Sequence, residues 1–102
     1  MYLVQVLLPV YDNEGTQFPA ERHHAVRDEL SERFGGLTAY TRAPAEGVWK
    51  ESAAQLSRDD IVVFEVMTPH LDSEWWAEYR RELENRFRQL HVVIRAQTIQ
   101  LL

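Results

Sequence analysis

The first ten residues have the pattern of a buried β-strand. Between Tyr2 and Val10 the even-numbered positions are all apolar, and the odd-numbered positions are apolar except for Gln5. Side chains of a strand point alternately to its two faces. Both faces of this strand therefore carry apolar residues, and we expect residues 2–10 to lie in the centre of a sheet.

Two later segments have the periodicity of amphipathic helices. Residues 19–34 begin with a proline, which suits the first helical turn, and are followed by Gly35, which suits a left-handed end. Residues 73–89 follow Asp72, and either Asp72 or Ser73 can cap free backbone N–H groups. Apolar residues recur along one side of each segment, in Val26, Leu30 and Phe34, and in Trp76, Tyr79 or Arg80, Leu83 and Phe87.

Charged side chains one turn apart indicate the outer faces of these helices. The spacing predicts pairs between Glu29 and Arg33, Glu82 and Arg86, and Glu84 and Arg88.

Three further segments are rich in β-formers. Residues 37–42 predict a second strand, residues 61–67 a third that is central in the sheet, and residues 90–102 a long final strand. Residues 48–50 form a short extension after a turn, and the direction in which residues 43–60 fold is left open. The order β-α-β-(β)-β-α-β is that of a ferredoxin-like α+β domain, with two helices on one face of an antiparallel sheet. We expect a single domain over residues 1–102.

At the level of element order, over its whole length, the chain resembles the dimeric α+β barrel superfamily. In that superfamily two ferredoxin-like subunits pack sheet against sheet. The resemblance implies a homodimer formed through the sheet face.

Composition narrows the possible partners. The chain has 102 residues, no cysteine and a net charge of −5, which excludes disulfides and disfavours attraction to nucleic-acid phosphates. No apolar run approaches the ~20 residues of a membrane span, and Met1 leads directly into a strand. We expect a cytoplasmic protein with no nucleic-acid or membrane partner.

Parity along the strands indicates an unusual polar group on the face away from the helices. If the even-numbered residues of the first strand face the helices, Gln5 lies on the opposite face, which we call the open face. The same argument puts Glu65 and Arg95 there, with His91 at the start of the final strand, and turns Leu90 inward. In ferredoxin-like strand order Gln5 lies between Glu65 and Arg95. The other residues on this face are mostly apolar, namely Leu3, Leu7, Ile61, Val63, Met67, Val93 and Ile99.

Two interpretations account for this polar trio. In the first, the open face is the interface of a symmetric dimer, where a Glu65–Arg95 ion pair bridged by Gln5 sets the register. In the second, the trio lines a pocket in which Arg95 holds an anionic or carbonyl group of a small molecule and Glu65 handles a proton. Dimer formation can itself build such a pocket.

Other candidate residues carry weaker signals. His91 and Tyr40 can border the pocket, and Trp49 can cap the open face or anchor a partner subunit. The four histidines lack chelate spacing and no phosphate-binding loop is present. We therefore expect neither a metal nor a cofactor.

Three functions stay open. The first is a homodimeric binding or accessory domain that uses the open face. The second is a cofactor-free enzyme of the monooxygenase or isomerase kind found in the dimeric α+β barrel superfamily, with its pocket around Glu65 and Arg95. The third is a module that binds another protein through the open face.

Overall fold

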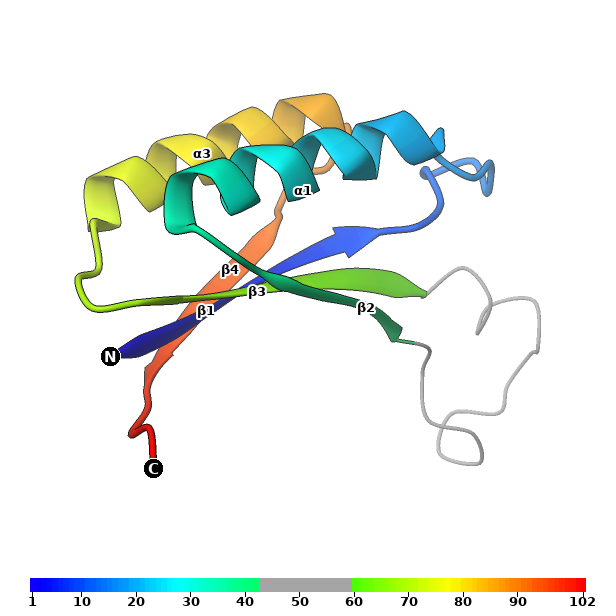
Figure 1. Cartoon of the computed structure of the whole chain (residues 1–102). Helices are drawn as coiled ribbons and strands as arrows, with labels where there is room; N and C mark the ends of the chain where they lie inside the picture. The colour runs from blue at the N-terminus through cyan, green and yellow to red at the C-terminus, as the bar shows by residue number, and fades with distance from the viewer. Residues whose placement is uncertain (43–59) are drawn as a thin grey trace, which may run out of the picture.

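The computed structural model describes residues 1–42 and 60–102, and it contains four strands and two helices in these ranges. Trp49 and the expected extension at residues 48–50 lie outside the described residues. Figure 1 shows both helices on one side of the sheet. In chain order the elements are β1 (Tyr2–Pro9), α1 (Ala20–Phe34), β2 (Thr38–Arg42), β3 (Ile61–Thr68), α3 (Ser73–Arg86) and β4 (Val93–Thr98).

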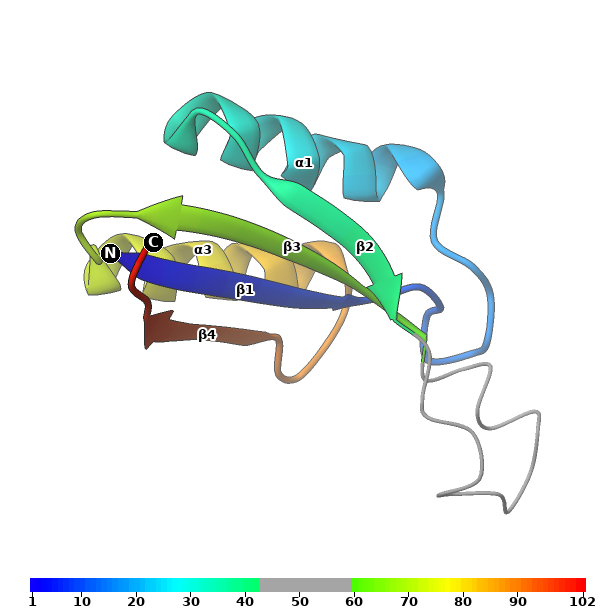
Figure 2. The ribbon, with the colours of Figure 1, turned by 60° about the horizontal axis from the view of Figure 1, so that its bottom comes forward.

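The four strands form one antiparallel sheet in the order β2-β3-β1-β4. β1 is central, as its two apolar faces predicted, and β3 is its inner neighbour (Figure 2). The order and the two helices on one face confirm the predicted ferredoxin-like α+β fold. β4 forms one edge of the described sheet.

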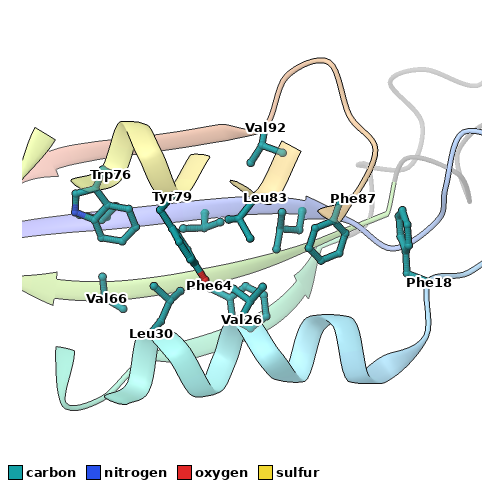
Figure 3. Close-up of a cluster of buried hydrophobic side chains, with 13 residues drawn as sticks. Phe18, Val26, Leu30, Phe64, Val66, Trp76, Tyr79, Leu83, Phe87 and Val92 are labelled. Carbon is teal, nitrogen blue, oxygen red and sulfur yellow. The ribbon is translucent and has the colours of Figure 1, made fainter. Parts of the chain in front are cut away.

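The core lies between the sheet and the two helices. Val4, Val6 and Leu8 of β1 are at most 1% exposed, so the even-numbered residues of β1 do face the helices. Trp76 is buried, as predicted, and it stacks on Phe34 with 5.2 Å between ring centroids. Figure 3 shows the buried side chains between the helices and the sheet. They come from both helices, the strands and the adjoining loops, and include Phe18, Val26, Leu30, Phe64, Val66, Tyr79, Leu83, Phe87 and Val92.

The helix ends follow the predicted chemistry. Pro19 occupies the N-cap position of α1, and Gly35 ends this helix with φ of 77°, a left-handed conformation that glycine adopts without steric cost. At α3 the Asp72 carboxylate accepts a hydrogen bond from the Trp75 N–H at 3.1 Å. Of the two capping candidates, Asp72 is the one used.

The final segment differs from the prediction. α3 ends at Arg86, and β4 covers only Val93–Thr98 of the expected residues 90–102. Arg88 has φ of 51°, which reverses the chain after the helix. Leu90, predicted to face inward, is 91% exposed, because it belongs to this reversal and not to the strand.

Among the described residues, one salt bridge connects the two helices. Arg86 forms a bidentate salt bridge with Glu29 of α1, both N–O distances being 2.8 Å, and the Tyr79 hydroxyl donates to Glu29 at 2.8 Å. The bond to Arg86 is the main cause that lowers the pKa of Glu29. The predicted Glu82–Arg86 pair is confirmed at 2.6 Å.

The other two predicted pairs are wrong. Glu29 pairs with Arg86 of α3 and not with Arg33. Arg88 lies beyond the end of the helix. Glu84 Oε2 instead lies 3.7 Å from Arg80 Nη1 and accepts the Val92 N–H.

No helix of the described residues is long and apolar enough to cross a membrane.

His23 lies at the end of the core nearest the start of α1. Its Nε2 lies 3.0 Å from the Pro9 carbonyl, which can only accept, so Nε2 carries a proton and donates. The ring packs against Phe87 and Phe18, with centroids 5.1 and 6.3 Å away. Burial lowers the pKa of His23 below its ordinary 6.5, although the bond to Pro9 opposes this shift.

A lowered histidine pKa makes folding stability depend on pH. Well above pH 6.5 His23 is neutral in both the folded and the unfolded state. As the pH falls through 6.5 the unfolded chain takes up the proton first, because the folded-state pKa is lower, so the free energy of unfolding falls. We expect His23→Gln to remove much of this fall, measured by urea unfolding between pH 7 and pH 5. His24→Gln, at the exposed neighbouring position, is the control and should retain the fall. Equal pH profiles for both variants would contradict the assignment.

Candidate functional site

Strand register brings the predicted polar trio together. Gln5 of β1 lies opposite Glu65 of β3 and, on its other side, opposite Arg95 of β4. The three residues therefore lie at one level of three adjacent strands, on the open face. This placement is the one predicted from parity.

Gln5 joins the two charges by hydrogen bonds. Its Nε2 donates to Glu65 Oε2 at 2.5 Å, and its Oε1 accepts from Arg95 Nε at 2.8 Å. A side-chain amide can do both because it has a donor end and an acceptor end. Among the described side chains neither Glu65 nor Arg95 forms a salt bridge, so the predicted bridging by Gln5 is present without a direct ion pair.

Tyr40 extends this arrangement to the fourth strand. β2 pairs with β3 so that Thr38 lies opposite Glu65 and Tyr40 lies opposite Val63. The Tyr40 hydroxyl reaches diagonally along β3 and donates to Glu65 Oε2 at 3.2 Å. We call Tyr40, Glu65, Gln5 and Arg95 the polar row, because it crosses all four strands.

Apolar side chains surround the polar row. Val63 is 1% exposed and lies outside the core cluster on the helix side, while Leu3 and Leu7 are partly buried. Met67 and Val93 are 53% and 49% exposed. The open face thus combines a fixed polar row with half-exposed apolar residues, as the sequence predicted.

A shallow pocket lies on the open face near β4. Its volume is about 250 Å³, and its lining residues are Leu3, Gln5, Arg95, Ala96 and Gln97. Two members of the polar row thus contribute to it, and Glu65 does not. Leu3 was predicted on this face but not as a pocket residue, because a pocket depends on side-chain packing that parity does not specify.

The remaining predicted site residues lie apart from the polar row. β4 begins at Val93, so His91 precedes the strand, and its side chain is exposed. Trp49 is outside the described residues. Within residues 1–42 and 60–102 no three histidine, aspartate or glutamate side chains form a group that could hold a metal ion.

A second cavity, of about 290 Å³, lies between α3 and β4 on the helix side. Trp76, Arg80, Ile94 and Ala96 are among its lining residues. Nothing in the sequence pattern indicated this cavity. Ala77 of α3 also lines it, so two of its lining side chains are small.

The polar row presents one acceptor group and one donor group on the open face. The carboxylate of Glu65 can accept hydrogen bonds from a polar or cationic group, and the guanidinium of Arg95 can bind an anionic or carbonyl group. The described polar row contains no serine, threonine or cysteine that could act as a nucleophile.

Gln5 is the residue on which the polar row depends. We expect Gln5→Met, which keeps the length of the side chain, to lower the free energy of unfolding by about 1 kcal/mol, since two hydrogen bonds to charged groups are lost at a partly exposed site. Gln97→Met, one step along the same face, is the control and should change it by less than ~0.5 kcal/mol. Urea unfolding measures both. Equal effects would show that the bridging bonds contribute no stability.

Comparison with known proteins yields one structural likeness. No family model matches the chain, and no curated protein matches it. Among solved structures it is similar to a phage SAM lyase in complex with S-methyl-5'-thioadenosine, with a TM-score of 0.59 and 15% identity. The match covers 94% of this chain and 79% of the other. At this identity the likeness shows the fold, a small α+β domain with an antiparallel sheet and two helices.

Proposed function

We propose that the protein is a homodimeric binding domain in which a second copy of the chain covers the open face of the sheet. The observation that carries the proposal is the composition of this face. Half-exposed Met67 and Val93 and partly buried Leu3 and Leu7 surround the polar row.

The physical argument concerns the two faces of β1. An apolar sheet face gains free energy when another layer removes it from water. The helices cover the even-numbered face of β1. The apolar residues on its odd-numbered face would likewise gain free energy from being covered. A second sheet would supply the missing layer, packed about 10 Å away, in the manner of the dimeric α+β barrels that the chain resembles.

Val93 offers a direct test because it is half exposed on β4. We expect the wild-type chain to sediment as a dimer at micromolar concentration, and Val93→Asp to weaken the dimer about 100-fold or more, since an unpaired carboxylate would be buried. Leu90→Asp, at an exposed residue outside the strands, is the control and should leave the dimer intact. A wild-type chain that is monomeric at these concentrations would contradict the proposal.

A small-molecule site is the second candidate function, supported by the pocket at Leu3, Gln5 and Arg95. The structural likeness suggests the compound to try first. The phage SAM lyase is in complex with S-methyl-5'-thioadenosine, a ligand whose hydroxyl and ring-nitrogen acceptors suit an arginine and an amide.

Isothermal titration with S-methyl-5'-thioadenosine tests this second candidate. We expect measurable binding that Arg95→Gln weakens at least ~10-fold, about the loss of one hydrogen bond to a charged group. Arg80→Gln, in the cavity on the helix side, should bind as the wild type does. No heat of binding at millimolar ligand would remove this compound as a candidate.

A further inference from the structure

We infer that the two copies meet about a two-fold axis parallel to β1, so that Glu65 of each copy pairs with Arg95 of the other. This inference rests on the proposed dimer and adds the orientation of its subunits. It follows from the positions of the two charges on the open face.

Two identical sheets can be stacked face to face in two simple ways. With the axis across the strands, each strand lies over its own copy, and Glu65 lies over the partner's Glu65. When the axis runs along the strands, the partner's strands lie over those of the first copy in the reverse order. Each residue keeps its position along the strand direction. The first arrangement brings like charges together, and the second does not.

The position of β1 makes the second arrangement self-complementary. β1 has β3 on one side and β4 on the other, each about 4.8 Å away. Register holds Glu65, Gln5 and Arg95 at one level. A rotation about β1 therefore carries Arg95 of the partner subunit over Glu65, and the partner's Glu65 over Arg95.

The side chains have the atoms to complete these pairs. Within residues 1–42 and 60–102, Glu65 accepts two hydrogen bonds, from Gln5 and Tyr40, and both go to Oε2. In the proposed dimer its Oε1 accepts from the partner. Arg95 donates from Nε to Gln5, and its two terminal nitrogens bind no other side chain of the described residues. In the proposed dimer they donate to the partner's Glu65. Bidentate pairing of a guanidinium with a carboxylate is the strong form of this contact.

The same rotation matches the apolar residues. Val63 and Val93 share the level of Leu7, and Met67 and Gln97 share the level of Leu3. Val93, which is 49% exposed, then lies above the strand position of the partner's Val63, and the side chain of Val63 is already buried within the single chain. Met67 lies over the partner's Gln97, and Leu3 and Leu7 lie over their own copies on the axis.

Charge reversal tests the pairing. Glu65→Arg alone creates two arginine–arginine contacts across the dimer, and Arg95→Glu alone creates two carboxylate contacts. Each should raise the dimer dissociation constant by about 100-fold or more. An equal mixture of the two variants should form a one-to-one heterodimer, because each contact then joins opposite charges. The chain carrying both substitutions should dimerise with itself.

The outcomes separate this inference from the proposed dimer. If the wild type is monomeric, both fail. If it dimerises but the single variants dimerise equally well, or the folded double variant does not dimerise, the dimer stands and the axis is wrong. Circular dichroism of each variant establishes that it is folded.

Cross-linking gives a second test that does not rely on charge reversal. The chain has no cysteine, so single cysteines can be placed without background. A mixture of Met67→Cys and Gln97→Cys chains should be joined by a short bismaleimide faster than Met67→Cys chains alone. The reverse order of rates would overturn the inference.

Discussion

The antiparallel register of β1 with both of its neighbours determines most of what this structure can do. It places the even-numbered residues of β1 under the helices and the odd-numbered residues on the open face. A shift of one residue would exchange these faces. Gln5 could then no longer lie between Glu65 and Arg95, and the core would lose Val4 and Val6.

Within that register, Gln5 connects two opposite charges by hydrogen bonds. Two opposite charges lie on either side of β1, and among the described residues they form no direct ion pair. The amide presents a donor to the carboxylate and an acceptor to the guanidinium, so both charges are fixed in orientation while each keeps bonding capacity for another group. The polar row therefore presents one negative and one positive group at the same level of the open face.

Much of this could be predicted because alternation in a strand is a local property. The two faces of β1 and β3, the stripes of both helices and the position of the trio all follow from parity and spacing. The start of β4 does not, because it depends on the reversed backbone at Arg88 and on the bond from the Val92 N–H to Glu84. The hydrogen bond from Tyr40 to Glu65 could not be predicted either, since it depends on the register in which β2 pairs with β3.

The central position of β1 also has a consequence for the kinetics of folding. Its two partners lie some 60 and 90 residues away in the sequence, so neither can pair with β1 until most of the chain is available. Such non-local contacts slow the search for the native state. Until β3 pairs with it, β1 leaves apolar side chains exposed to water, and such transiently exposed surface promotes aggregation. The strand that organises the folded sheet is thus also a site of aggregation before the sheet has formed.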